Sequence, residues 1–325
     1  MKTILISGGA GYLGTVLSQE LLKNYKVVIF DQLYFPWIFK NKKKFKLSKN
    51  LKFIKKNITD IEITDFNGID IVCDLNGISN DPSSELNSSH TWDVNYKSRV
   101  KFAQLAKKAG VKRFIFNSTC SVYGFNKNKV YEDGKKNPLS TYAKANYKAE
   151  NKIIKLKNNN FKVNALRNST LFGFSNTMRL DLVINIFVFN LMRKKKIYID
   201  GDGKQFRPFI SVSDIVKIYI HIIKKNNLPS FICNLVSFNN TIADIATKIS
   251  KILKVDKKLI NFKNNLVDKR NYKVGSKKFT KYFGKNFKFA NFSTEIKILE
   301  KNMKKFKIKK NDQTIRMKFY KKKLL

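Results

Sequence analysis

Three glycines near the N-terminus have the spacing of a phosphate-binding turn. Gly8, Gly11 and Gly14 follow the apolar, β-branched run 2–7 and precede a segment, 12–24, in which leucine and valine recur at helical spacing. Glycine permits a tight turn and lets the backbone approach a pyrophosphate, while the start of a helix offers free N–H groups and the positive end of its dipole. The required order of strand, turn and helix is present, so the sequence predicts a dinucleotide-binding unit.

An acidic residue ends the second predicted strand of this unit. Asp31 follows the apolar run 27–30. A carboxylate at this position accepts hydrogen bonds from both hydroxyls of the cofactor ribose and repels a 2′-phosphate. We therefore expect the cofactor to be NAD rather than NADP.

Strand-like and helix-like patterns alternate along the first half of the chain. Further apolar runs predict strands at 51–54, 69–75, 113–117, 162–166 and 231–235. Strands that alternate with helices indicate a parallel sheet. We expect an α/β protein, a Rossmann-type doubly wound parallel sheet with a smaller C-terminal substrate-binding lobe.

The pattern changes after Arg167, where a long helix-like stretch, 181–192, begins a second lobe. We expect residues 1–167 to form the NAD-binding domain and 168–325 to form mainly the substrate lobe, with segments near 205–237 returning to the first domain. The basic segment from Lys301 is expected to be a helix followed by a frayed tail.

The charge balance of the chain is strongly basic. Its 325 residues contain 66 Lys and Arg against 23 Asp and Glu, a formal net charge of +43, and 43% of them are hydrophobic, which indicates a globular protein. A basic excess is typical of proteins that bind nucleic acid or anionic membranes. Here lysine is spread along the chain and arginine, the usual base-reading residue, is scarce. We therefore interpret the excess as solvated basic faces and expect neither partner.

Cysteine and histidine are few. Cys73, Cys120 and Cys233 are widely spaced, and His90 and His221 are the only histidines. We expect no metal site and no disulfide framework. The first apolar run is too short for a signal peptide or a membrane span, so we expect a cytoplasmic protein.

Several short motifs follow the glycine turn in order: Ile58-Thr59-Asp60, then 117–124 (NSTCSVYG), 140–144 (STYAK), 201–203 (GDG) and 207–214 (RPFISVSD). With them, nearly the whole chain resembles the extended short-chain dehydrogenase/reductases, specifically the nucleotide-sugar epimerase/dehydratase family. The resemblance implies that Asp60 contacts the adenine and that Leu75, Asn76 and Gly77 line the pyrophosphate and ribose of NAD. Asn95 resembles a family Asn buried beneath the active site, and a helix-packing amide is an equal alternative. The expected cofactor-binding residues are Gly8, Gly11, Tyr12, Leu13, Gly14, Asp31, Asp60, Leu75, Asn76, Gly77, Asn95, Ser118, Tyr142 and Asn146.

The resemblance also implies a catalytic set of Tyr142, Thr119 and Asn146. Thr119 and Tyr142 would face the sugar hydroxyl that is oxidised, with Tyr142 as the base. A phenol whose pKa is near 10 is a poor base at neutral pH, and a nearby cation is the usual remedy. The family motif Tyr-x-x-x-Lys supplies that cation, but position 146 is Asn. Asn146 can hydrogen-bond the nicotinamide ribose but carries no charge.

Lys144 is no obvious substitute, because residues two apart on a helix do not share a face. Three consequences of Asn146 stay open: a slower enzyme with a more alkaline pH optimum, another Lys that reaches in from a different segment, or loss of redox chemistry.

The residues after Thr119 help to select the reaction. The 4,6-dehydratases of the family carry Asp and Glu at the next two positions, whereas this chain has Cys120 and Ser121. Without those proton-transfer groups, reversible oxidation at a carbinol is the expected chemistry. Cys120 is interpreted as a packed residue rather than a nucleophile.

The substrate contacts implied by the resemblance are Thr119, Thr170, Arg207 and Arg270. The arginines match nucleotide-phosphate contacts, for which the bidentate guanidinium is well suited. Thr170 stands where many epimerases place a uridine-diphosphate-binding Asn, so the nucleotide stays open.

The leading hypothesis is an NAD-dependent epimerase-type oxidoreductase that acts on a nucleotide-activated sugar through a transient keto intermediate, in polysaccharide biosynthesis. Two alternatives stay open: a nucleotide-sugar reductase or dehydrogenase, and a non-catalytic NAD-binding module with a basic binding surface. The resemblance further implies a homodimer through helices at 97–109 and 142–156.

Overall fold

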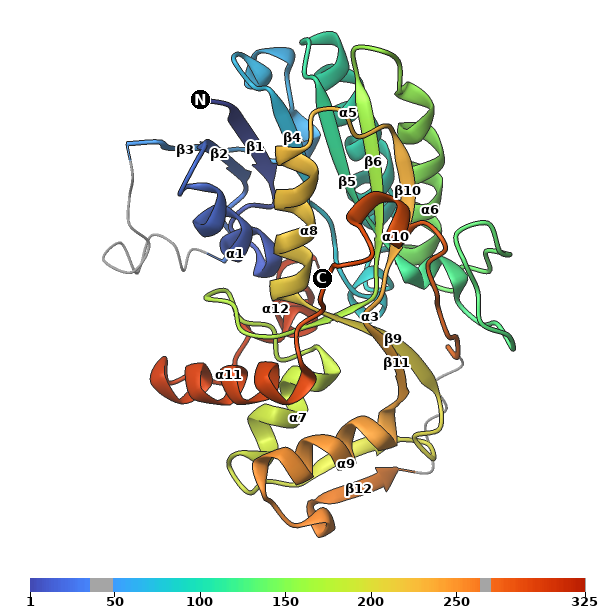
Figure 1. Cartoon of the computed structure of the whole chain (residues 1–325). Helices are drawn as coiled ribbons and strands as arrows, with labels where there is room; N and C mark the ends of the chain where they lie inside the picture. Colours follow the sequence, from blue (N-terminus) through green and yellow to red (C-terminus); the bar gives the residue numbers. More distant parts are fainter. Residues whose placement is uncertain (36–48, 264–269, 325) are drawn as a thin grey trace.

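A computed structural model describes residues 1–35, 49–263 and 270–324. Its centre is a seven-stranded parallel sheet with the strand order β10-β6-β5-β4-β1-β2-β3 (Figure 1). The strands are β1 (Thr3–Ser7), β2 (Lys26–Asp31), β3 (Leu51–Lys55), β4 (Ile71–Asp74), β5 (Arg113–Thr119), β6 (Lys162–Asn168) and β10 (Phe231–Leu235). The predicted Rossmann-type fold and its strands are confirmed. Because the order reverses between β1 and β4, a crevice for ligands is expected at the carboxyl ends of these strands.

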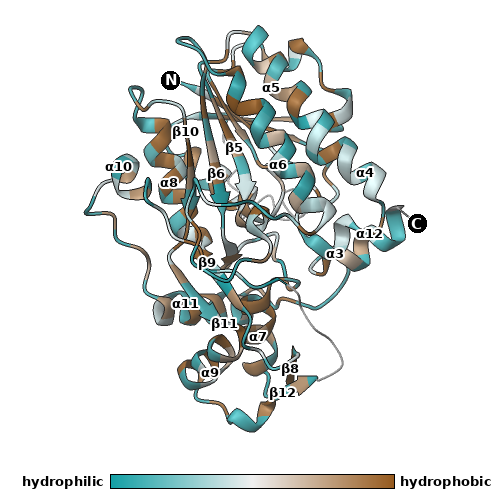
Figure 2. Ribbon diagram, turned by 90° about the vertical axis from the view of Figure 1, so that its right-hand side faces the viewer, coloured by the Kyte–Doolittle hydropathy of each residue, from teal (hydrophilic) through white to brown (hydrophobic). Residues whose placement is uncertain are grey.

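Helices cover both faces of this sheet. On one face α1 (Tyr12–Leu21) contacts α8 (Val212–Lys224), and on the other α5 (Arg99–Lys108) contacts α6 (Thr141–Ile153). The strands are therefore buried on both sides, which accounts for their nearly continuous apolar runs (Figure 2). A single-turn α4 (Ser88–Trp92) and a π-helical turn (Asp93–Ser98) lead into α5.

A second lobe lies below the carboxyl ends of the strands (Figure 1). Two small sheets form it, one of order β11-β9-β7 and one that pairs β12 with β8. Its elements are β7 (Thr170–Phe172), α7 (Val183–Leu191), β8 (Ile197–Asp200), β9 (Phe206–Ser211), β11 (Phe238–Thr241), α9 (Ile242–Leu253), β12 (Ile260–Lys263) and α11 (Phe292–Lys305). Between them the chain returns to the large sheet, where α8 packs on α1 and β10 pairs with β6.

The C-terminal segment departs from the prediction. The expected frayed tail is wrong, because α12 (Arg316–Leu324) is a helix that contacts the short α3 (Asp81–Ser84). Phe319 holds it in place, with its ring centroid 4.7 Å from that of Phe35 and 5.6 Å from that of Tyr34. Because this segment is rich in lysine, its sequence pattern did not reveal the apolar side that packs against the loop after β2.

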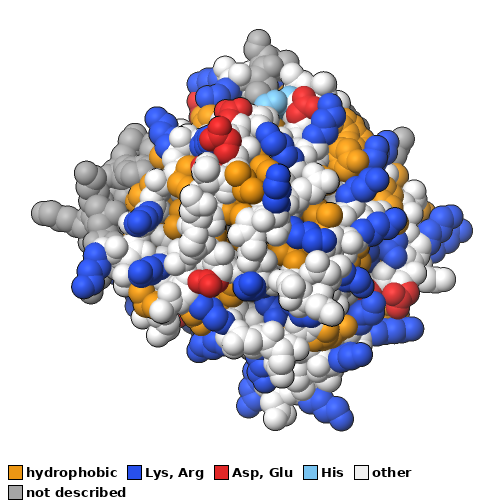
Figure 3. Space-filling view, turned by 90° about the horizontal axis from the view of Figure 1, so that it is seen from above, with side chains coloured by type: hydrophobic (Ala, Val, Ile, Leu, Met, Phe, Trp, Pro, Cys, Tyr) orange, Lys and Arg blue, Asp and Glu red, His pale blue; other side chains and the backbone are white. Residues whose placement is uncertain are grey.

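Lys and Arg side chains are scattered over the face seen in Figure 3, among hydrophobic and uncharged side chains and a few acidic ones. The three cysteines are buried and unbridged. Within the described ranges, no helix has the length and apolarity to cross a bilayer, and no three His, Cys, Asp or Glu side chains gather as metal ligands.

Candidate active site

Two cavities meet at the carboxyl ends of the central strands. The first, which we call the glycine-turn cavity, is lined by Gly8, Gly11 and Gly14 and by the ends of β2 and β4. The second, the arginine cavity, has a volume of about 500 Å³ and is lined by Arg179, Arg207 and Arg270. The two share the wall residues Ser79, Asn117, Leu171 and Arg179.

Backbone contacts require glycine at the turn between β1 and α1. Gly8 has φ +69°, and its N–H donates to the carbonyl of Phe30 at 2.9 Å. A Cβ at Gly14 would lie 2.3 Å from the carbonyl oxygen of Gly8, so no larger residue fits without moving the turn. The backbone therefore closes tightly around the start of α1, which fits the close approach of a pyrophosphate.

Asp31 ends β2 at the edge of the glycine-turn cavity. Its carboxylate accepts hydrogen bonds from the backbone N–H groups of Leu33, at 2.7 Å, and Ala10, at 3.1 Å. Burial raises the pKa of this carboxyl. An acceptor held on two amides at this place fits ribose hydroxyls, so the cavity fits the pyrophosphate and ribose of a dinucleotide.

The structure brings most of the predicted cofactor residues to these cavities and leaves three away from them. The glycine-turn cavity is lined by Gly8, Gly11, Tyr12, Leu13, Gly14, Asp31, Leu75, Asn76 and Gly77, and the arginine cavity by Ser118 and Tyr142. Asp60, Asn95 and Asn146 line neither cavity. Asp60 is exposed in the 3-10 turn Ile58–Asp60. Asn95 is buried. Its side chain accepts from the N–H of Ile78 at 2.8 Å and donates to the carbonyl of Ile78 at 3.0 Å, so it fixes the backbone of the loop after β4.

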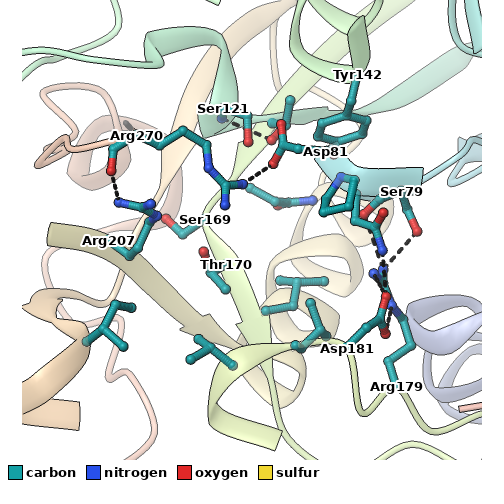
Figure 4. A pocket seen from close by; sticks show the side chains of 18 of the residues that line it. Ser79, Asp81, Ser121, Tyr142, Ser169, Thr170, Arg179, Asp181, Arg207 and Arg270 are labelled. Atoms are coloured by element: carbon teal, nitrogen blue, oxygen red, sulfur yellow. Dashed lines mark hydrogen bonds and ion pairs between the residues drawn. The ribbon is translucent and has the colours of Figure 1, made fainter. Parts of the chain in front are cut away.

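Tyr142 (Figure 4) and Thr119 both line the arginine cavity. Thr119 ends β5, and Tyr142 stands in the first turn of α6, where its N–H donates to Ser84 at 3.1 Å. The Thr119 hydroxyl accepts from the backbone N–H of Ser121 at 3.0 Å. Burial raises the pKa of Tyr142, and the nearby Asp81 adds to this rise, while the Thr119 side chain and two arginines, Arg99 and Arg179, oppose it.

Asn146 has a different environment from the predicted one. Its side chain is buried, donates to the carbonyl of Tyr142 at 2.8 Å and accepts from Arg99 at 2.7 Å. No lysine of the described segments lines either cavity. The cation that approaches Tyr142 from a different segment is therefore not a lysine but Arg99, which is buried behind the wall of the arginine cavity.

Positions 120 and 121 hold no acid or base. The Cys120 thiol is buried and donates to the carbonyl of Arg167 at 3.1 Å, and burial raises its pKa to about 12, so it is a packed residue. Ser121 hydrogen-bonds the phenol of Tyr272 across the arginine cavity. Ser118 donates to the buried Glu150 at 2.6 Å.

Three arginines reach the arginine cavity from distant segments (Figure 4). Arg270 forms an ion pair with Asp81, and Arg207 donates to the carbonyl of Arg270. Arg179 binds Asp181 through two bonds, at 2.8 and 3.1 Å, and reaches the hydroxyl of Ser79 at 2.8 Å. Thr170 lines the same cavity.

Sequence reasoning missed Arg179, which lines both cavities, and Arg316 and Tyr320 of α12, which line the glycine-turn cavity. A usable signal was present. Only eight residues of this lysine-rich chain are arginines, and none of them is exposed. Arginine in this sequence therefore indicates a place where the guanidinium is enclosed by protein or faces a cavity.

Comparisons with known proteins show which family and which relatives the chain is similar to. The model of the NAD dependent epimerase/dehydratase family matches residues 4–234. An uncharacterized UDP-glucose epimerase of Bacillus subtilis (strain 168) is 30% identical over 235 residues, 69% of this chain and 73% of that protein. Human dTDP-D-glucose 4,6-dehydratase is 26% identical over 263 residues, 78% of this chain and 74% of that protein.

Solved structures show the same fold over the described chain. The UDP-N-acetylglucosamine 4-epimerase of Methanobrevibacter ruminantium M1, in complex with UDP-N-acetylmuramic acid, superposes with a TM-score of 0.83 at 23% identity. The superposition covers 94% of this chain and 99% of that one.

Proposed function

The chain belongs to the NAD-dependent epimerase/dehydratase family, and from that premise we propose that it epimerises a nucleotide-activated sugar through a transient keto intermediate. The observation that carries the proposal is the wall around Tyr142. The phenol and the Thr119 side chain both line the arginine cavity there, and the two residues that follow Thr119 are Cys120 and Ser121. The phenol would serve as the base for a carbinol, while positions 120 and 121 hold no acid and base pair for eliminating water.

In the proposed reaction Tyr142, as the phenolate, takes the proton from one sugar hydroxyl while Thr119 holds the same oxygen by a hydrogen bond. NAD, which the glycine turn and Asp31 would hold, would supply a reversible hydride acceptor for the carbinol carbon. After the keto sugar has turned in the arginine cavity, Tyr142 gives its proton back to the oxygen. Protons and electrons balance over the cycle, so the product differs from the substrate only in configuration.

The glycine turn and Asp31 would hold the cofactor. The turn offers backbone N–H groups at the start of α1 to the pyrophosphate, and Asp31 accepts from the ribose hydroxyls. Leu75, Asn76 and Gly77 would close the other wall, at the end of β4.

Arg207 and Arg270 are proposed to bind the two phosphates of the substrate nucleotide. Both line the arginine cavity, and arginine binds phosphate oxygens in pairs. Three carboxylates also line this cavity: Asp81 is paired with Arg270, Asp181 is paired with Arg179, and Asp200 is exposed at the end of β8. None of them stands at the two positions after Thr119.

The test is NMR of UDP-, dTDP-, GDP- and CDP-sugars incubated with the purified protein and substoichiometric NAD, with Tyr142→Phe as the control. A new epimer in excess over NAD, absent with the control variant, is the expected result. NADH formed in step with an oxidised sugar would instead establish a dehydrogenase. NAD binding without turnover of any sugar would favour a non-catalytic module.

We also propose a homodimer that acts in the cytoplasm. The outer surfaces of α5 and α6 are the proposed interface, as the family resemblance implies. The three buried, unbridged cysteines support a reducing compartment. The mass in solution, measured by light scattering, tests the dimer.

A further inference from the structure

A buried ion pair lies behind Tyr142. Arg99, at the start of α5, and Asp74, at the end of β4, have exposed fractions of 2% and 0%, and Nε lies 2.7 Å from the carboxylate. The Nη2 group donates to the carbonyls of Asn117, at 3.0 Å, and Asp74, at 3.2 Å, and the guanidinium lies 4.0 Å from the ring centre of Phe116. An ion pair this deeply buried is costly to desolvate, so its presence calls for a physical reason.

The Nη1 group of Arg99 is directed at Asn146. It donates to the Asn146 Oδ1 atom at 2.7 Å, and the Nδ2 atom of the same amide donates to the carbonyl of Tyr142 at 2.8 Å. Because only the oxygen end of the amide can accept from a guanidinium, Arg99 fixes which end of Asn146 faces Tyr142. A chain of hydrogen bonds therefore joins Asp74, Arg99, Asn146 and the first turn of α6.

We propose that Arg99, acting through Asn146, is a positioning residue that favours the phenolate of Tyr142, in place of the lysine absent at position 146. This inference rests on the proposed function, in which Tyr142 is the base. A cation near a buried phenol favours the ionised form of that phenol, and a guanidinium is the side chain best suited to supply a permanent charge.

In the described part of the chain, the charged groups that shift the pKa of Tyr142 most are Asp81 from α3, Arg99 from α5 and Arg179 from the loop before α7. Asp81 is paired with Arg270, and Arg179 with Asp181. Around Arg99 the facing groups are Asp74 and, from α8, the phenol of Tyr219. Asp74 binds the Nε side of the Arg99 guanidinium and offsets part of its positive charge. Removing Arg99 should therefore raise the pKa of Tyr142, and removing Asp74 should lower it.

The first experiment measures the phenol directly. Protein with ¹³Cζ-labelled tyrosine is titrated by NMR with and without NAD, and the Tyr142 resonance is assigned by its absence in Tyr142→Phe. We expect Arg99→Gln to raise the pKa of Tyr142 by about one unit and Asp74→Asn to lower it by a similar amount. A merely structural role predicts no such reversal of sign.

A second buried pair provides the matched control. Arg167 and Glu150 are as deeply buried as Arg99 and Asp74, at 2.7 Å, and the Arg167 guanidinium binds Glu150, the phenol of Tyr123 and the carbonyl of Glu132 rather than Asn146. Arg167→Gln should therefore lower stability without moving the Tyr142 titration. If Arg99→Gln does not fold, Arg99→Lys, which keeps the charge, and the double variant Arg99→Gln/Asp74→Asn are both expected to titrate close to the wild type.

The second experiment follows sugar oxidation against pH. Because the rate rises as Tyr142 ionises, Arg99→Gln should move the acid limb of the profile to higher pH, and adding Asn146→Lys should move it back. Shifts of the same sign in Arg99→Gln and Asp74→Asn, or none, would overturn the inference while sugar turnover leaves the proposed function standing. Opposite NMR shifts without turnover of any sugar would uphold the electrostatic role of Arg99 and reject the proposed function.

Discussion

The two cavities that meet at Asn117 are built in different ways. The glycine-turn cavity is formed mainly by residues within the first 80, at the ends of β1, β2 and β4. Its more distant lining comprises His90, Val94, the residues Asn117, Leu171 and Arg179 near the arginine cavity, and Arg316 and Tyr320 of α12. The arginine cavity takes its walls from segments that span residues 79–317. Arg270 and Asp81, which pair across it, are 189 positions apart in the sequence.

This difference determines what a sequence can reveal. In the glycine-turn cavity the backbone dictates residue type, because a Cβ at Gly14 would overlap the carbonyl of Gly8. In the arginine cavity residue type is set by a partner from another segment, and many combinations of charges would serve. Local motifs therefore predict the first cavity, and only the folded chain reveals the second.

The largest effect is expected from Gly14→Ala, which adds a Cβ where the backbone of the glycine turn leaves no room for one. The added Cβ would lie 2.3 Å from the Gly8 oxygen and 2.6 Å from the Gly9 Cα, both backbone atoms. We expect a fall of about 3–4 kcal/mol in the free energy of unfolding and loss of measurable NAD binding. Urea denaturation and calorimetric titration with NAD provide the measurements.

Gly68→Ala is the control for this prediction. Gly68 also has a positive φ, +71°, but a Cβ there meets nothing within 4 Å, so only the backbone strain of about 1 kcal/mol is expected. Equal losses in the two variants would show that the turn is not held by close packing, and the contrast between the cavities would lose its basis.

The parts that sequence reasoning predicted are those with local causes. The parallel strands follow from continuous apolar runs, and the turn and Asp31 follow from the geometry of one βαβ unit. The environment of Asn146 was missed because Arg99 comes from another helix and contacts it only in the folded chain. The helix α12 was missed because its aromatic contacts lie with Tyr34 and Phe35, far away in sequence.

The next largest effect is expected in the arginine cavity, from Arg270→Gln. If Arg270 binds a substrate phosphate, its loss removes one or two charge-assisted hydrogen bonds worth about 1.5–3 kcal/mol, so KM for the nucleotide sugar should rise about 10- to 100-fold. NAD affinity should stay unchanged. Arg193→Gln is the control, because that guanidinium binds the carbonyls of Phe189 and Ile308 and lines neither cavity. A change in NAD affinity with KM unaltered would mean that Arg270 contacts the cofactor and that the arginine cavity is wrongly assigned to the substrate.

A pH effect is expected at Asp31. Burial raises the pKa of its carboxyl in the folded protein. Ribose hydroxyls donate to the ionised form, so NAD binding should release a proton and weaken as the pH falls through this raised pKa. Folding responds with the opposite sign: the raised pKa favours the folded state at acid pH, and this contribution is lost as the pH rises through the folded value.

Calorimetry in two buffers of different ionisation enthalpy measures the proton release on NAD binding. Asp31→Asn should abolish this release and weaken NAD about tenfold, as expected for the loss of a charged acceptor. Asp70→Asn is the control, because Asp70 accepts from the backbone of Thr3 at the opposite end of the sheet. Proton release that persists in Asp31→Asn would place the titrating group elsewhere.

The smallest effect tests the part of the glycine-turn cavity wall that comes from α12. Tyr320 lines this cavity from α12, and its truncation removes one aromatic face without touching the glycine turn. We expect Tyr320→Ala to weaken NAD binding about three- to tenfold, the scale of one aromatic contact, with little change in KM for the sugar. Lys321→Ala, an exposed neighbour on the same helix, should change neither. An effect of Tyr320→Ala on KM alone would assign α12 to the substrate rather than to the cofactor. The predicted effect on NAD makes α12 the strongest exception to local construction, since a wall from residues 316–324 would then reach the cofactor.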